Sequence, residues 1–260
     1  MIKWIKNLFK KPLLTQYFIR FGTDFTTIIN RDNEIILKTT SEIAINGQSC
    51  YPINHDEIVM CDEAMLMFKR YNNELKKMAY NLKGSAIYVS VPALSAEVEV
   101  RAFAYALKVA KPYSVLYVCE LFSAFAYLKQ NTDIESMLII DINSDTVKIS
   151  IVNQYEIIYH KELGLRDREE YDSIRKELHK RNYESSISRA NEEILCKGYT
   201  YQKAFIIGSS EILVKKYKDW IINILQIEIE IPKDFTNAIA FGIGVVYKDR
   251  PDLFRRINLN

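Results

Sequence analysis

Two stretches of the chain repeat one pattern of apolar and polar positions. Residues 17–30 and 33–38 form alternating apolar runs broken by short polar turns, and residues 137–152 and 155–160 repeat that arrangement. Runs of β-branched and aromatic residues that flank short polar turns are typical of strands joined as hairpins. The pattern therefore predicts two copies of one three-stranded unit.

Helical periodicity follows each copy. In the first half, residues 95–111 and 121–129 have the helical pattern around a strand at 114–119; in the second half, helices are predicted at 168–181, 186–195 and 211–225, with strands at 204–207 and 227–231. Two successive β-β-β-α-β-α units predict an α/β fold in which two lobes face a cleft.

The first eleven residues have a separate amphipathic pattern. At about 100° per residue, the apolar and polar side chains fall on opposite faces of a helix. The apolar face holds Met1, Ile2, Trp4, Ile5, Leu8 and Phe9, and the polar face holds Lys3, Lys6, Asn7, Lys10 and Lys11. Helices of this kind lie in the membrane interface, where lysines are attracted to anionic lipids. We expect residues 1–11 to bind a membrane, with packing on the protein's own surface as the alternative.

Composition narrows the class of protein. The 260 residues include only 8 glycines and 6 prolines, which excludes collagen-like and linker-like chains. The net charge is +2, and four of the basic residues lie in the first eleven, so the body lacks the broad basic surface of a nucleic-acid binder. Four scattered cysteines and three histidines predict neither a zinc site nor disulfides, which favours a cytoplasmic protein without a resident metal. No apolar stretch approaches the ~18 residues of a spanning helix.

Six segments, taken in order, resemble the actin-like ATPases and most closely the bacterial actin MreB. They are Phe21-Gly-Thr23 in the first turn, residues 91–102 (VPALSAEVEVRA), residues 118–124 (VCELFSA), residues 141–146 (DINSDT), residues 206–210 (IIGSS) and residues 240–244 (AFGIG). The resemblance implies the actin-like, ribonuclease H-like two-lobe fold with duplicated units.

The resemblance also implies a domain layout for a shortened chain. The first lobe would comprise residues 15–135 and 236–260, with a reduced small subdomain at about 39–77. The second lobe would comprise residues 136–235 and lack its small subdomain. We therefore expect a reduced actin-like protein whose peripheral subdomains are small or missing.

In this family the phosphates of a nucleotide lie between the two hairpin turns. The resemblance assigns to that cleft, from the first turn, the second turn and the adenosine-side turn in order, Arg20, Gly22, Thr23, Asp141, Asn143, Thr146, Gly208 and Ser209. It also places Glu120 at the position of the catalytic glutamate. ATP and Mg²⁺ are the cofactors that the family would take.

Several of these positions depart from the family pattern. Arg20 replaces the aspartate that helps to hold hydrated Mg²⁺, and Asn143, Ser144 and Asp145 replace the central glycines of the second turn. Without glycine the backbone approaches phosphate less closely, and Asp145 adds a repelling charge. We expect a degenerate ATPase site in which neither ATP nor Mg²⁺ is a certain cofactor. Glu120 would then be a solvated or salt-bridged residue, with Arg20 as a candidate partner.

Three functions follow from these observations. The first is an MreB-like scaffold on the inner face of a membrane, with lost or weakened ATPase, that acts in cell shape or envelope machinery. Its partners would be copies of itself, a full-length bacterial actin, or envelope and shape-determining proteins. The second is an ATP-dependent filament-forming actin in which Arg20 contacts phosphate. The third is an adaptor of a pilus or secretion apparatus with an actin fold, similar to PilM.

Overall fold

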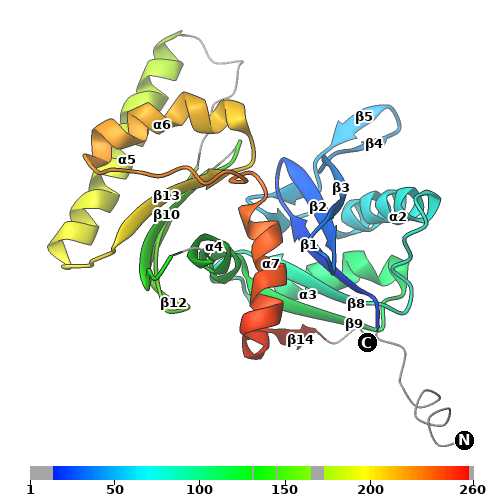
Figure 1. Cartoon of the computed structure of the whole chain (residues 1–260). Coiled ribbons are helices and arrows are strands. Elements are labelled where there is room, and N and C mark those ends of the chain that lie inside the picture. The colour runs from blue at the N-terminus through cyan, green and yellow to red at the C-terminus, as the bar shows by residue number, and fades with distance from the viewer. Residues whose placement is uncertain (1–13, 131, 145, 165–172, 258–260) are drawn as a thin grey trace, which may run out of the picture.

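The computed structural model describes residues 14–130, 132–144, 146–164 and 173–257, without the side chains of 173–183. Two large β-sheets, each covered by helices, dominate this part of the chain (Figure 1). The first sheet has the strand order β14-β9-β8-β1-β2-β3. Its strands are β1 (Gln16–Phe21), β2 (Phe25–Asn30), β3 (Ile35–Thr40), β8 (Ala86–Val91), β9 (Ser114–Cys119) and β14 (Arg255–Ile257). Strands β1, β8 and β9 are parallel, whereas β2, β3 and β14 are antiparallel to their neighbours.

The second sheet repeats the hairpin arrangement with the order β12-β11-β10-β13. Its strands are β10 (Ser136–Ile142), β11 (Thr146–Asn153), β12 (Glu156–Gly164) and β13 (Lys203–Gly208). Strand β10 pairs antiparallel with β11 and parallel with β13, as β1 does with β2 and β8. The internal repeat in the sequence is therefore a repeat of sheet topology.

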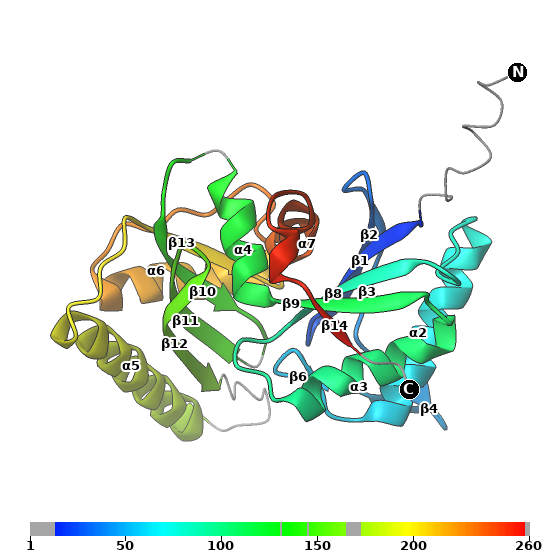
Figure 2. The same ribbon diagram turned by 90° about the horizontal axis from the view of Figure 1, so that it is seen from below.

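The helices form three layers around the two sheets (Figures 1 and 2). They are α2 (Cys61–Lys77), α3 (Glu97–Leu107), α4 (Glu120–Lys129), α5 (Ser173–Cys196), α6 (Glu211–Leu225) and α7 (Ala238–Asp249), with short 3₁₀ turns η1 (Lys108–Ala110) and η2 (Pro251–Leu253). Helices α2 and α3 pack on the outer face of the first sheet, and α5 and α6 on the outer face of the second. Helices α4 and α7 lie between the sheets, where they cover both inner faces.

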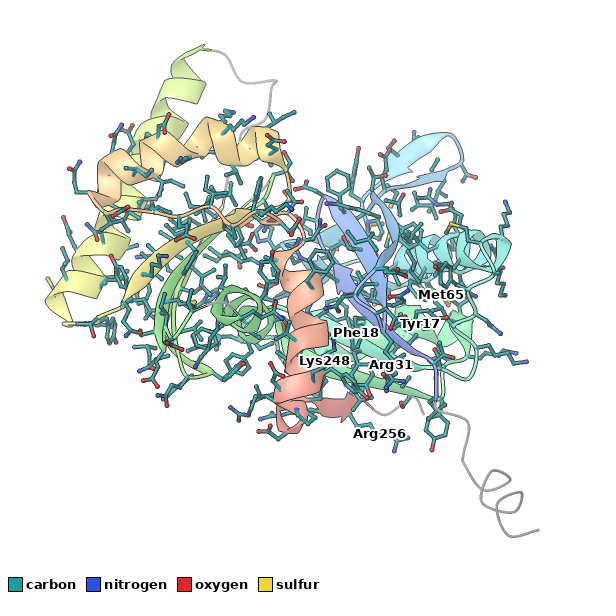
Figure 3. The ribbon with its side chains drawn as sticks, viewed as in Figure 1. Tyr17, Phe18, Arg31, Met65, Lys248 and Arg256 are labelled. Carbon is teal, nitrogen blue, oxygen red and sulfur yellow. The ribbon has the colours of Figure 1, made fainter. Side chains whose placement is uncertain are left out.

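Strand alternation decides which side chains point between the lobes. Successive side chains of a strand point to opposite faces. In β1, Ile19 and Phe21 pack with α2 and α3, so Phe18 and Arg20 point to the inner face, where Phe18 lies beside α7 (Figure 3). In β10, Ile140 and Ile142 face outward, so Asp141 faces inward. Both sheets thus direct a charged residue toward the interior of the molecule.

The two inner helices touch through their backbones at Gly242. A Cβ atom at this position of α7 would lie 1.8 Å from the carbonyl oxygen of Ser123 in α4. No real Cβ atom approaches an oxygen so closely, so only glycine permits this crossing. A close α4–α7 contact fixes how the two sheets sit relative to one another, and with it the geometry of the space between the hairpin turns.

Three predicted elements differ from the structure. From Ser173 onward, the two helices expected at 168–181 and 186–195 form one helix, α5, because the residues between them include neither glycine nor proline to end it; residues 168–172 lie outside the described residues. The strand expected at 227–231 is reduced to a single bridge between Glu230 and Phe205. Residues 1–11, expected as a membrane-binding helix, lie outside the described residues.

Peripheral elements are small in both lobes. Between β3 and β8 the chain forms two short hairpins, β4 (Ile43–Ile45) with β5 (Gln48–Cys50) and β6 (Ile53–Asn54) with β7 (Glu57–Ile58), followed by α2. Between β12 and β13, the described part of the chain contains only α5. No helix among the described residues is long and apolar enough to cross a bilayer.

Candidate functional site

The residues that the sequence assigned to the cleft lie near one another, between the two hairpin turns. Arg20 is near the end of β1, Asp141 is near the end of β10, and Glu120 begins α4. The side chains of all three are at least 90% buried. Gly22 and Thr23 form the first turn, Asn143 and Thr146 flank the second, and Gly208 and Ser209 end β13. This placement is a property of the fold, whereas the role of these residues in binding a nucleotide stays a prediction.

The centre of this region is a lysine that the sequence analysis did not single out. Lys148 lies on β11 directly opposite Asp141 in the hairpin register, and its side chain is 1% exposed. Its Nζ donates to Asp56 Oδ2 at 2.7 Å and to Glu120 Oε1 at 2.9 Å. Glu120 is therefore buried and salt-bridged, as one of the two expectations had it, but its partner is Lys148; a solvated glutamate and a partner in Arg20 are wrong. A lysine inside the apolar run of residues 146–152 was the available signal, because a buried ammonium needs a partner.

The second residue missed by the sequence analysis is Asp56, in the tight turn between β6 and β7. Asp56 Oδ2 accepts from Lys148 and, at 3.2 Å, from Asn143 Nδ2, and it lies 4.0 Å from Arg20 Nη2. Asp56 Oδ1 accepts the backbone N–H of Thr23 at 2.8 Å, and Thr23 Oγ1 accepts the N–H of Asp56 at 2.9 Å. Nothing in the local sequence indicates that this turn reaches the other lobe.

A second carboxylate joins the lobes at the adjacent turn. Asp24, which follows the first turn, accepts the backbone N–H of Ser144 at 3.1 Å and the hydroxyl of Ser209 on the same oxygen, Oδ2. Backbone N–H groups from both hairpin turns therefore donate to aspartates of this chain. We call Arg20, Asp56, Glu120, Asp141 and Lys148 the ion cluster.

The charges of the ion cluster set its protonation. Burial works to raise the pKa of Asp56, but Lys148 and Arg20 outweigh it and hold that pKa at about 2. Burial dominates at Asp141, where the pKa rises to about 6 even though Arg20 Nη2 lies 3.8 Å from Oδ2. Burial would lower the pKa of Lys148, yet Asp56 and Glu120 raise it well above its ordinary value. Two cations thus face Glu120, the firmly ionised Asp56 and Asp141, whose pKa is raised to about 6.

These residues do not fit a magnesium nucleotide. The turn N–H groups that would face phosphate oxygens donate to Asp56 and Asp24, and both cations are already engaged by carboxylates. Additional negative charge from a polyphosphate would be repelled at this low-dielectric position. Within the described ranges, no group of three or more His, Cys, Asp or Glu residues is arranged to hold a metal ion.

The retained glycine of the third turn has a packing role. A Cβ atom on Gly208 would lie 2.4 Å from the carbonyl oxygen of Ile142 on the neighbouring strand. The absence of a side chain therefore allows β13 to end against β10, and this requirement holds whether or not a nucleotide is present.

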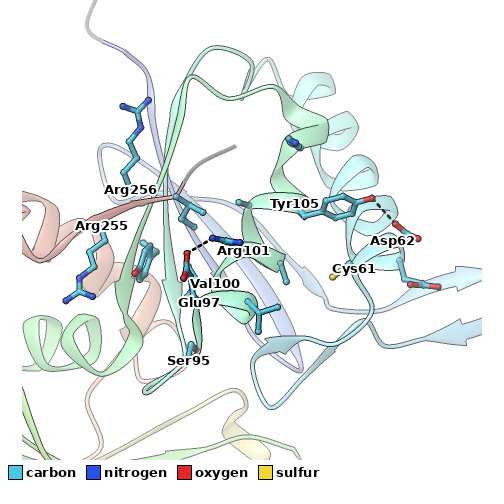
Figure 4. A pocket seen from close by; sticks show the side chains of 16 residues that line it. Cys61, Asp62, Ser95, Glu97, Val100, Arg101, Tyr105, Arg255 and Arg256 are labelled. Atoms are coloured by element: carbon cyan, nitrogen blue, oxygen red, sulfur yellow. Dashed lines mark hydrogen bonds and ion pairs between the residues drawn. The ribbon is translucent and has the colours of Figure 1, made fainter. Parts of the chain in front are cut away.

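The described surface has one hollow beside the hairpin turns and a larger one elsewhere in the first lobe. One, of about 640 Å³, opens beside the turns and is lined by Thr23, Asp24, Ser144 and by apolar residues that include Phe25 and Leu213. A larger hollow of about 1090 Å³ lies away from the ion cluster, between α2, α3 and β14 (Figure 4). Its rim carries the Arg101–Glu97 ion pair and the Tyr105–Asp62 hydrogen bond, whereas Arg255 and Arg256 line its β14 side. Only the first hollow communicates with the cleft residues.

The ion cluster predicts a pH dependence that one substitution should remove. Because the folded-state pKa of Asp141 is raised, its stabilising contribution is complete below its ordinary value of 3.8 and is lost as the pH rises through about 6. Asp141→Asn mimics the protonated form. Relative to the wild type, its free energy of unfolding should increase by about 2 kcal/mol between pH 4.5 and pH 7.5.

Urea denaturation at the two pH values measures this difference, with Asp32→Asn in an exposed turn as the matched control. An Asp141→Asn effect that is equal at both pH values would show that Asp141 does not titrate between them, which contradicts a pKa of about 6. Asp56 has the opposite pH dependence. Its contribution to the free energy of unfolding is present above its ordinary pKa and is lost as the pH falls toward 2.

Comparisons with known proteins place the fold. The sequence matches no protein-family model and no curated protein. The structure is similar to MreB5 of Spiroplasma citri bound to ADP (TM-score 0.70, 15% identity, 91% of this chain and 97% of that chain). It is also similar to MreB5 bound to AMPPNP (0.72, 15%, 92% and 98%) and to the ethanolamine utilization protein EutJ from Carboxydothermus hydrogenoformans (0.61, 12%, 94% and 96%). The expected α/β two-lobe fold is confirmed, and the chain has the fold of the actin-like ATPases.

Proposed function

We propose that this chain is an MreB-like scaffold of the actin fold that neither hydrolyses ATP nor needs it to hold its lobes together. The observation that carries the proposal is the ion cluster between the hairpin turns. Lys148 pairs with Glu120, which the family resemblance assigns to the position of the catalytic glutamate, so this carboxylate is engaged by a cation of the chain.

Direct contacts between the lobes support the same proposal. Lys148 and Asn143 on the second sheet donate to Asp56 of the first lobe, and Ser144 donates to Asp24. At the rim, His55 Nδ1 lies 2.8 Å from Glu162 Oε1 of β12, which adds a further contact between the lobes. A ligand that bridges two lobes is unnecessary where side chains of the chain already bridge them.

The proposed place of action is the inner face of a membrane, reached through residues 1–11. Support for this comes from the sequence, where lysines and large apolar residues segregate to opposite faces. The proposed partners are copies of this chain, a full-length bacterial actin, or envelope and shape-determining proteins. A scaffold attached in this way would contribute binding surfaces and shape, with assembly independent of nucleotide.

An ATP-dependent filament is the second candidate. The observation that favours it is the similarity of the whole chain to MreB5, whose solved structures are bound to ADP and AMPPNP. Under that alternative, Arg20 and Lys148 would have to exchange their carboxylate partners for phosphate. The two candidates differ in one measurable property, the response to Mg-ATP.

Isothermal titration of the full chain with Mg-ATP should give no binding heat up to millimolar nucleotide. Phosphate release should remain at the buffer rate, because the turn N–H groups and both cations are engaged within the chain. Pelleting with and without Mg-ATP should give equal amounts of sedimented protein. Micromolar affinity or ATP-gated pelleting would support the filament candidate instead, and a chain that stays monomeric yet binds one peptide tightly would favour the adaptor.

Membrane attachment is tested separately by co-sedimentation with vesicles that contain anionic lipid. The full chain should pellet with the vesicles, and Trp4→Glu should abolish pelleting, since it places a charge on the apolar face. Asn7→Glu, on the polar face, is the matched control and should weaken pelleting only modestly. Equal pelleting of the full chain and a chain that lacks residues 1–11 would contradict attachment through this segment.

A further inference from the structure

One carboxylate of the ion cluster, that of Asp56, accepts hydrogen bonds from several kinds of donor. Asp56 receives an ammonium from Lys148, an amide N–H₂ from Asn143, a backbone N–H from Thr23 and, at 3.4 Å, the Thr23 hydroxyl. The Arg20 guanidinium adds a second positive charge at 4.0 Å. Charged and backbone donors that converge on one point from several elements are how proteins bind phosphate-class anions.

The donors belong to elements other than the one that carries Asp56. Arg20 and Thr23 come from the first sheet and its turn, and Asn143 and Lys148 come from the second sheet. Asp56 itself is supplied by a separate small hairpin, β6–β7. The donor set is therefore a preformed anion site, and Asp56 is its occupant.

The backbone of the β6–β7 turn positions the Asp56 carboxylate among these donors. Its two central residues, His55 and Asp56, both have positive φ, 54° and 62°, as a two-residue hairpin turn of the primed type requires. Ile53 and Ile58 on either side are buried in the first-lobe core and anchor the turn. The hairpin thus holds one carboxylate inside the molecule, against the cations of the cleft.

We propose that Asp56 is a built-in anionic ligand, which fills a site whose donors would otherwise bind a phosphate-class anion. This inference rests on the proposed function, in which the wild-type cleft takes no nucleotide. The hollow of about 640 Å³ that Thr23, Asp24 and Ser144 line shares Thr23 with this site, so it lies on the side from which an anion would enter.

The charge balance of the cluster makes the test feasible. In Asp56→Ala, Lys148 keeps Glu120 at 2.9 Å and Arg20 keeps Asp141 at 3.8 Å, so each cation retains one partner. The donors freed are the Thr23 N–H, the Asn143 amide and one position each on Lys148 and Arg20. A space that Lys148, Arg20, Asn143 and Thr23 line remains at the position of the carboxylate.

The experiment is isothermal titration with inorganic pyrophosphate, without metal, of the full chain and three variants. Asp56→Ala should bind pyrophosphate roughly tenfold or more tightly than the wild type, and pyrophosphate should raise its melting temperature. Asp56→Asn keeps the space filled and should show no gain. Asp32→Ala removes an exposed aspartate from the β2–β3 turn and controls for the change in net charge.

A folded Asp56→Ala protein that binds pyrophosphate no better than Asp32→Ala would overturn the inference. If Asp56→Ala is unfolded alone, the readout becomes refolding in pyrophosphate. Refolding supports the inference, and no refolding at any concentration contradicts it. Wild-type binding of Mg-ATP would instead contradict the proposed function. A wild type that binds no Mg-ATP, together with an Asp56→Ala variant that binds no pyrophosphate, would contradict this inference alone.

Discussion

The fold depends on neutralising the charge of one buried ammonium group, that of Lys148. Lys148 is 1% exposed and points between two sheets that α4 and α7 otherwise fill with apolar side chains. An isolated charge at such a position is strongly unfavourable, so the fold must bring carboxylates to it. Glu120 arrives at the start of α4 and Asp56 on a hairpin of the other lobe. Neutralising Lys148 therefore ties together the second sheet, an inner helix and the periphery of the first lobe.

That requirement links fold and function. A cleft between lobes binds ligands when its donors and charges are left free for them. Here the hairpin turns donate to Asp56 and Asp24, and the glycines at Gly208 and Gly242 serve close backbone contacts. The proposed function relates the low glycine content of the chain to the carboxylates in its cleft, because side chains of the protein occupy positions that a nucleotide would need. Under the proposed function the fold needs no such ligand, because its lobes contact each other directly.

Sequence patterns predicted the architecture and most members of the site, but they missed the two residues that organise it. Strand alternation and the internal repeat were enough for both hairpins, whereas Arg20 and Asp141 were assigned to the cleft by the family resemblance. The sequence does contain a signal for Lys148, a charged residue within a strand that is otherwise apolar, but it does not show which residues neutralise that charge. Asp56 carried none, because its role depends on a loop crossing to the other lobe, and local periodicity holds no information about such a contact. The error at α5 arose in the same way, since a mixed-charge segment does not show where a helix continues.

We propose that carboxylates of this chain, and no nucleotide, hold the two turns together. Hydrogen exchange at the backbone amides of Thr23 and Ser144 tests it most directly, because these two N–H groups donate to Asp56 and Asp24. Both amides should be protected in the wild-type chain without ligand, and their exchange rates should be unchanged by Mg-ATP. Rapid exchange of both amides that slows when Mg-ATP is added would contradict the account.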